Sequence, residues 1–185
     1  DLIERHDRAR FELIGISWGP DDGSAARARL ARAFDRFIDA SKKSDPDVAQ
    51  LLRPLPVGIA IDLKGHTQSS RPGIFARRPA PLQVSWLGFP GTTASDFHDY
   101  VLADRIVLPH DQQPFWSEKI VHLPDCYQAN DPSRPLAAVT RAQAGLPHEA
   151  FVFATFNQHR KINREFFDIW MRLLAAVPGS VLWLL

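Results

Sequence analysis

The sequence contains one cysteine, Cys126, one methionine and no long apolar run. A lone cysteine excludes a framework of intrachain disulfides and favours a reducing compartment, so we expect a cytoplasmic protein. A membrane-spanning helix needs roughly 20 consecutive apolar residues, and no segment approaches that length. We therefore expect no membrane among the partners of this chain.

An excess of charge of one sign is also absent. The 22 lysines and arginines nearly balance the 21 aspartates and glutamates, which gives a formal net charge of +1. Arg29 and Arg32 are followed by Asp35 and Asp39, so the basic residues form no continuous stripe. Nucleic acid is therefore not an expected partner.

Metal-binding and nucleotide-binding signatures are missing as well. None of the seven histidines stands four residues from another, and the single cysteine has no second thiol to complete a metal site. We therefore expect no metal and no cofactor. The chain also has neither a Gly-x-Gly-x-x-Gly sequence nor a Walker sequence, so a fingerprint dinucleotide site and a P-loop are both unsupported.

What the sequence does contain is an alternation of apolar strands and amphipathic helices. Strands are predicted over residues 11–17, 57–63, 82–86, 99–103, 118–123, 151–156 and 180–185. Helices are predicted over residues 1–10, over a stripe from Leu30 through Phe34, Phe37 and Ile38, from Asp45–Pro46 to Leu52, and over residues 162–177. The order strand, helix, helix, strand over residues 11–63 predicts a crossover unit of a parallel sheet, and thus an α/β fold.

Local signals also mark the helix starts. Asp22 or Ser24 is expected to cap the second helix, and Asp45 the third, with Pro46 at its first helical position. Asn163 is expected to cap the last helix.

Residues 124–148 predict a linker. The segment is rich in proline and polar residues, with Pro132, Pro135 and Pro147, and shows little periodicity. It separates residues 1–123, read as most of a first lobe, from residues 149–185, read as the start of a second. Because the chain stops inside the apolar strand 180–185, which needs partner strands and covering helices, we expect a fragment of a longer protein.

Three loops that follow strands carry polar or glycine-rich sequence. In Phe156–Asn163, Lys161 precedes the expected cap Asn163, where a helix N-terminus and a lysine together suit a phosphate. The glycines of Leu87–Thr92 allow backbone amides to approach a ligand closely. The simpler alternatives are a solvated βα loop for the first segment and a tight turn without a ligand for the second.

The third loop places Asp62, Lys64 and His66 near one edge of the predicted sheet, where acid–base chemistry is conceivable. The simpler alternative is that His66 is an ordinary surface histidine, because these residues form no recognisable triad.

Taken together, several collinear motifs resemble the catalytic region of O-linked N-acetylglucosamine transferases. The segments are Ser17–Gly23, Gly65–Arg71, Arg78–Gln83, Trp86–Thr92, Phe156–Ile162 and Val177–Leu185. The resemblance covers essentially the whole chain, in order, and the short linker and His66 are similar to the bacterial and plant SPINDLY branches. At His159-Arg160 the sequence departs from the Leu-Tyr of the animal pattern.

This resemblance implies a GT-B architecture: a Rossmann-like first lobe, then the first βαβ unit of a second Rossmann-like lobe. Members usually carry preceding tetratricopeptide repeats, here outside the chain, and transfer a sugar from a nucleotide donor to Ser or Thr hydroxyls of proteins. Transfer inverts the anomeric carbon and needs no metal. The implied activity moves GlcNAc from UDP-GlcNAc to protein or peptide acceptors, with the UDP-sugar a substrate, and this fragment alone is expected to be inactive.

The resemblance also assigns site residues. Leu87, Gly88 and Pro90 would line the sugar pocket, and His66 would lie on the acceptor side. Gln158 and Lys161 would face the nucleotide diphosphate, with Lys161 as the catalytic group. The alternatives are a GT-B transferase with another donor, such as GDP-fucose, or another acceptor, and a binding lobe without catalysis.

Overall fold

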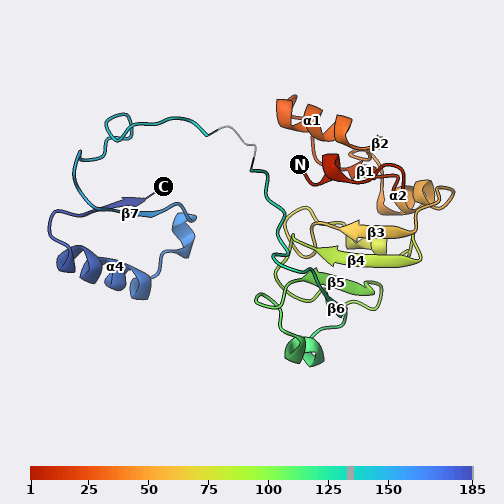
Figure 1. Ribbon diagram of the computed structural model, residues 1–185. Coiled ribbons are helices and arrows are strands. Elements are labelled where there is room, and N and C mark those ends of the chain that lie inside the picture. Colours follow the sequence, from red (N-terminus) through yellow and green to blue (C-terminus); the bar gives the residue numbers. More distant parts are fainter. Residues whose placement is uncertain (133–135, 185) are drawn as a thin grey trace. The chain divides into compact units, whose positions relative to one another are not determined.

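The structure is a computed structural model that describes residues 1–132 and 136–184 (Figure 1). The chain divides into two compact units, residues 1–132 and 133–185. This division falls inside the segment 124–148. Pro135, one of the prolines of that segment, and Leu185, the end of the last predicted strand, lie outside the described residues.

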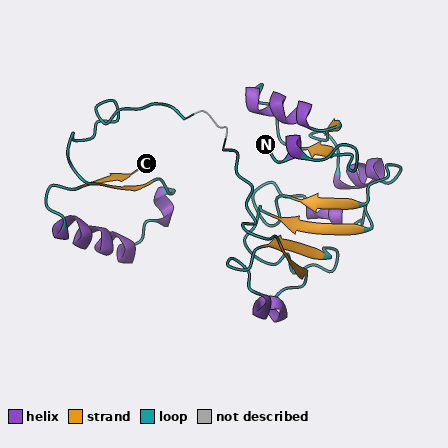
Figure 2. Ribbon diagram, viewed as in Figure 1, coloured by secondary structure: helices purple, strands orange, loops and turns teal. Residues whose placement is uncertain are grey.

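The first unit is built around a four-stranded parallel sheet. Its strands are β3 (Ile59–Asp62), β4 (Leu82–Trp86), β5 (Tyr100–Ala103) and β6 (Lys119–His122), in the order β3-β4-β5-β6. Figure 2 shows these four arrows side by side. Because all four strands are parallel, their carboxyl ends lie at one edge of the sheet. The sequence analysis predicted each of them within a few residues.

A second, two-stranded parallel sheet pairs β1 (Ile14–Ser17) with β2 (Arg36–Asp39), joined by α1 (Ala25–Ala33). Ser24 caps α1, since its side chain accepts a hydrogen bond from the backbone N–H of Arg27. The predicted continuation of this helix through Phe37 and Ile38 is wrong. Helical spacing of the apolar residues there is coincidental, because the chain becomes extended at Phe34 and pairs with β1.

The predicted crossover from the first strand to residues 57–63 is also corrected. The first strand pairs with β2, whereas β3 belongs to the four-stranded sheet. Between them, α2 (Asp45–Leu52) begins with a capping box in which Ser44, not Asp45, is the N-cap residue. The carboxylate of Asp45 is used elsewhere, because it accepts a 2.6 Å hydrogen bond from the Arg71 guanidinium.

Two apolar clusters stabilise the first unit. One joins α2 to the short helix α3 (Pro72–Phe75) and contains Ala40, Val48, Leu52, Ile74 and Phe75. The other lies around β5, β6 and the 3-10 helix η2 (His110–Phe115) and contains Val101, Ala103, Leu108 and Ile120. Burial of these side chains provides the hydrophobic driving force that holds the sheet and its connections together.

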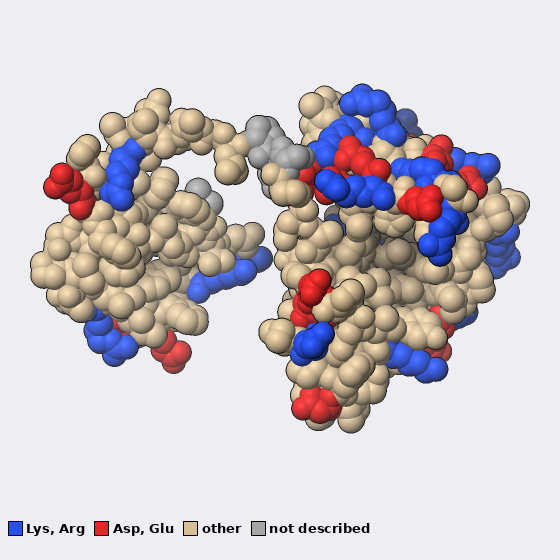
Figure 3. Space-filling model, viewed as in Figure 1, with Lys and Arg blue, Asp and Glu red and all other residues tan. Residues whose placement is uncertain are grey.

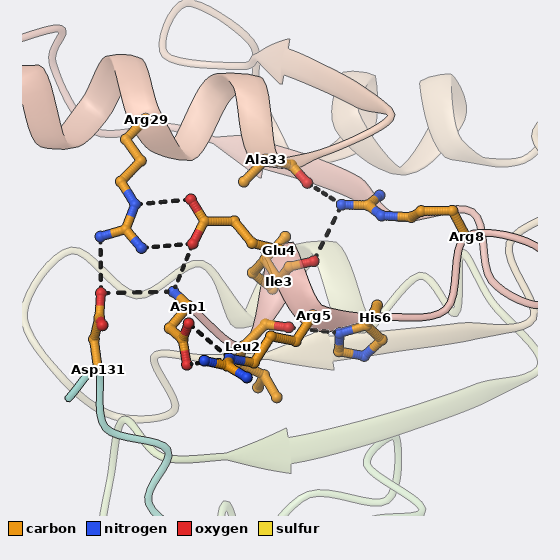
Figure 4. A network of polar contacts seen from close by, with 10 residues as sticks. All are labelled: Asp1, Leu2, Ile3, Glu4, Arg5, His6, Arg8, Arg29, Ala33 and Asp131. Atoms are coloured by element: carbon orange, nitrogen blue, oxygen red, sulfur yellow. Dashed lines mark hydrogen bonds and ion pairs between the residues drawn. The ribbon is translucent and has the colours of Figure 1, made fainter. Parts of the chain in front are cut away.

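The predicted N-terminal helix over residues 1–10 is reduced to one 3-10 turn, η1 (Ile3–Arg5), with no side-chain cap. Short helices without caps are marginal in water, and ion pairs hold this segment instead. Figure 4 shows the Arg29 guanidinium between Glu4, at 2.7 and 2.5 Å, and Asp131, at 2.8 Å. Arg29 thus connects the turn, α1 and the last residues of the first unit.

The second unit is a βαβ arrangement. Its elements are β7 (Val152–Thr155), the 3-10 turn η3 (His159–Lys161), α4 (Arg164–Ala176) and β8 (Val181–Leu184), with the two strands parallel. Trp170 and Leu173 of α4 face Phe153 and Leu182 of the strands across a small apolar cavity. Asn163 caps α4 as predicted, accepting a 2.9 Å hydrogen bond from the N–H of Phe166.

Candidate functional site

The carboxyl ends of β3 and β4 carry the loops that hold the predicted sugar-side and acceptor-side residues. In open parallel α/β sheets, this edge is where ligands bind. The chain turns sharply at Leu87, whose φ of 71° lies in the left-handed region. A 2.9 Å hydrogen bond from Gly88 N–H to the Trp86 carbonyl closes a three-residue γ-turn around Leu87. Backbone strain at a leucine is rare, and it tends to occur at functional sites.

Gly88 is required by a close approach of two backbones. A Cβ at this position would stand 2.3 Å from the carbonyl oxygen of Leu63 and 2.6 Å from the Cα of Lys64. Only glycine allows the loop after β4 to lie directly against the loop after β3. The sequence analysis expected close backbone approach here, although it assigned that approach to a ligand.

His66 lies in the same pair of loops. Its Nε2 is 2.9 Å from the carbonyl oxygen of Thr93, and its ring packs edge-on against Phe89, with centroids 5.2 Å apart. Phe89 stands between two of the predicted sugar-side residues, Gly88 and Pro90. The structure therefore brings His66 together with the segment Leu87–Pro90.

The contacts of Asp62 argue against the acid–base role that the sequence made conceivable. Asp62 is 4% exposed, and its Oδ1 accepts hydrogen bonds from the N–H groups of Lys64 (2.8 Å) and Gly65 (3.2 Å). Burial alone would raise the pKa of Asp62, but His98 and the two N–H donors outweigh it and hold that pKa below the ordinary value. Asp62 therefore acts as a buried turn cap, ionised at neutral pH.

His98 is a buried partner of Asp62. Its Nε2 lies 3.5 Å from Asp62 Oδ2, and its Nδ1 is 2.9 Å from the Ser95 hydroxyl. The ring packs against Phe75 and Phe97. Only the fold reveals this pairing, because Asp62 and His98 stand far apart in the sequence.

Glu118 is a second group that sequence reasoning missed. It is fully buried, and Thr93 donates both its backbone N–H, at 2.7 Å, and its hydroxyl to Glu118 Oε1. The hydroxyls of Thr92, at 2.6 Å, and Ser117, at 3.0 Å, donate to Oε2. Burial pushes the pKa of Glu118 upward, but these donors hold it below the ordinary value. The carboxylate therefore anchors the loop that follows Leu87–Pro90, the predicted sugar-side segment. The sequence signal that could have identified Glu118 is a charged residue at the start of the apolar strand predicted over 118–123.

The predicted diphosphate residues lie in the second unit. Gln158 directly precedes η3, and its Oε1 accepts a 2.7 Å hydrogen bond from Arg160. Lys161 ends η3 with an exposed side chain, two residues before the cap Asn163. The arrangement places a lysine and a capped 13-residue helix start in one loop, which suits an anion.

Among the described residues, no group of three or more His, Cys, Asp or Glu side chains is arranged to hold a metal ion. The sequence has one Asp-x-Asp, Asp45-Pro46-Asp47, but those carboxylates accept hydrogen bonds from Arg71 and from the Ser44 cap.

None of the described helices has the length and apolarity to cross a bilayer. In Figure 3, Lys and Arg atoms mix with Asp and Glu atoms over the region of α1.

Comparisons with known proteins place these features in a family. The model of glycosyl transferase family 41 matches residues 2–139 and 129–185. A relative from Arabidopsis thaliana, named probable UDP-N-acetylglucosamine–peptide N-acetylglucosaminyltransferase SEC, is 37% identical over 97% of this chain and 19% of its own length. A second Arabidopsis thaliana relative carries the same enzyme name with the suffix SPINDLY. It is 36% identical over 96% of this chain and 20% of its own length.

A solved structure agrees. A mutant of the O-GlcNAc transferase from Thermobaculum terrenum matches with a TM-score of 0.85 and 31% identity, over 99% of this chain and 34% of that protein. The predicted α/β fold class, with the Rossmann-like parallel sheets of a GT-B enzyme, is thereby confirmed. This chain spans about a fifth of the length of the plant relatives. It belongs to glycosyl transferase family 41.

Proposed function

We propose that the full-length protein is an inverting protein O-glycosyltransferase that moves GlcNAc from UDP-GlcNAc to Ser or Thr hydroxyls. The observation that carries this proposal is the near-complete coverage of the chain by relatives named UDP-N-acetylglucosamine–peptide N-acetylglucosaminyltransferases. These names favour UDP-GlcNAc over the other donors considered above. The proposed place of action is the cytoplasm, which suits a lone free cysteine.

In this proposal the sugar of the donor lies against Leu87, Gly88 and Pro90. The γ-turn at Leu87 and the tight packing at Gly88 fix the backbone of that segment before any ligand arrives. Such pre-organisation lowers the cost of ordering the site on binding. His66, which contacts Phe89 of the same segment, would face the acceptor hydroxyl.

The diphosphate would be held by Lys161, Gln158 and the N-terminus of α4. Breaking the glycosyl–phosphate bond places negative charge on the leaving oxygen, and a fixed positive group near that oxygen stabilises the transition state. Lys161 supplies a compact ammonium, and the helix adds the partial positive charge of its first N–H groups. This arrangement supplies positive charge without a metal ion, so we propose metal-independent transfer.

The test is transfer by the full-length protein. Purified protein is incubated with UDP-GlcNAc and a Ser/Thr-containing peptide or protein acceptor, and the added sugar is detected by mass spectrometry. UDP-glucose and GDP-fucose serve as competing donors, and a reaction without enzyme is the control. Preferential GlcNAc transfer supports the proposal. Transfer only from another donor, or donor binding without any transfer, would replace it with one of the alternatives.

A further inference from the structure

Thr93 connects a buried carboxylate to an exposed histidine. Its N–H and hydroxyl both donate to Glu118 Oε1, while its own carbonyl oxygen is the hydrogen-bond partner of His66 Nε2. Glu118 is 0% exposed, whereas His66 lies at the surface. Thr93, in the loop after β4, therefore connects the buried Glu118 carboxylate to His66 at the carboxyl edge of the sheet.

The contact with Thr93 determines which nitrogen of His66 carries the proton. A carbonyl oxygen only accepts hydrogen bonds, so the Nε2 of His66 must be the N–H donor. In the neutral ring the lone pair is then on Nδ1. A histidine held in this way has one defined tautomer, and its other nitrogen is free to accept a proton from a hydroxyl.

The same carboxylate also fixes the end of the sugar-side segment. The Thr92 hydroxyl donates to Glu118 Oε2 at 2.6 Å, only two residues after Pro90. Gly88 holds the start of that segment against Leu63. A buried carboxylate is costly unless its lone pairs accept hydrogen bonds, and here Thr92 and Thr93 of this loop and the neighbouring Ser117 donate to it.

We propose that Glu118 is a positioning residue for the acceptor side of the site: acting through Thr93, it fixes the orientation and tautomer of His66. This inference rests on the proposed transferase function. Glu118 is 0% exposed, so in this proposal it would contact neither substrate itself. Its replacement therefore acts by letting Thr93 and His66 move, and misplacement by about 1 Å costs up to about 10²-fold in efficiency.

The experiment uses the full-length protein with UDP-GlcNAc and a peptide acceptor, and measures kcat and both KM values. Glu118→Ala removes the carboxylate, and we expect it to lower kcat/KM for the acceptor by about 10- to 100-fold. Thr93→Val removes only the hydroxyl contact, because the backbone N–H and carbonyl remain, so its loss should be smaller. Glu118→Gln keeps one oxygen for Thr93, and Thr93→Ser keeps the hydroxyl, so both should stay within a few-fold of wild type. Should Glu118→Ala not fold, Thr93→Val against Thr93→Ser carries the comparison.

A double-mutant cycle separates positioning from simple stabilisation. In a His66→Ala background, Glu118→Ala should change kcat/KM for the acceptor little further, because the group that it positions is gone. Asp47→Ala, which removes the capping box of α2 in the same unit, is the control for lost stability and should leave kcat/KM for the acceptor unchanged.

Each outcome discriminates between the two proposals. Multiplicative effects of the two substitutions, or an unchanged kcat/KM for the acceptor in both Glu118→Ala and Thr93→Val, would overturn the role of Glu118 while transfer by the wild type persists. Absence of transfer by the wild type would overturn the proposed function, and this inference with it.

Discussion

Gly88 and Leu63 lie so close that a single methyl group at Gly88 would stand 2.3 Å from the Leu63 carbonyl oxygen. The contact joins two backbones, so no side chain can rotate away to make room. It fixes the distance between the loops that carry His66 and the sugar-side segment.

Gly88→Ala should therefore displace the loop after β4. We expect a loss of stability of about 1–3 kcal/mol, as for other overpacked sites, together with a higher KM for the nucleotide sugar. Thermal unfolding and donor kinetics of the full-length protein measure the two effects. Gly58→Ala is the matched control, because a Cβ at Gly58 meets nothing within 4 Å. Equal effects of the two substitutions would contradict this account of Gly88.

Lys161→Ala should lower kcat by about 10²–10³-fold, the usual cost of losing one electrostatic contact to a transition state. Lys161→Arg should restore only part of the rate, because a planar guanidinium does not replace a compact ammonium. Arg172→Ala removes a charge from a later turn of α4 and should leave kcat unchanged. A Lys161→Ala enzyme that turns over at the wild-type rate would make Lys161 an ordinary solvated loop residue.

Chelation should not reduce transfer. The proposed charge stabilisation comes from Lys161 and the N-terminus of α4, so turnover with excess EDTA should equal turnover without it. Loss of activity on chelation, with recovery on adding Mg²⁺ or Mn²⁺, would show that a divalent ion is needed.

The Glu4–Arg29 pair predicts a specific pH dependence. The hydrogen bonds from Arg29 lower the pKa of Glu4 from 4.5 to about 2. A carboxyl whose pKa is lower in the folded state stabilises the fold fully above its unfolded pKa and loses that contribution as the pH falls through its folded value. The contribution should therefore be nearly complete above pH 4.5 and be lost as the pH falls through about 2.

Thermal unfolding of wild type and Glu4→Gln between pH 7 and pH 2 tests this dependence. The difference between their midpoints should be small, because the pair is exposed, yet largest at neutral pH and absent near pH 2. Glu12→Gln breaks another exposed ion pair, with Arg36, and is the control. A difference that grows toward acid pH would have the wrong sign.

The elements of the fold were predicted best where a short apolar run has clear boundaries. Residues 82–86 follow Pro81 and coincide with β4, and Asn163 caps α4 as expected. The prediction failed at residues 34–39, where helical spacing and strand pairing compete. There the ring of Phe34 packs over Gly15, and the hydrogen bonds of β1 decide for a strand.

The site was predicted only in part, for a physical reason. The glycines and the proline of Leu87–Thr92 predict a turn after β4 from the sequence alone. The partners that hold the turn cannot be found in this way, because Glu118 stands 25 residues from Thr93, and His66 stands 27 residues before it. Contacts over such separations depend on the order of strands in the sheet, which local patterns do not determine.

The loop after β4 limits how the donor preference of the proposed transferase can change. Leu87, Gly88 and Pro90 lie at its start, and Thr92 and Thr93, which donate hydrogen bonds to the buried Glu118 carboxylate, follow within three residues. Selection for a different sugar can alter the side chains at positions 87 and 90. Changes at 88 would disrupt the contact with Leu63, and changes at 92 or 93 would remove hydrogen bonds to Glu118. We expect new donor preferences in this lineage to arise at those two outer positions, while the inner ones drift little.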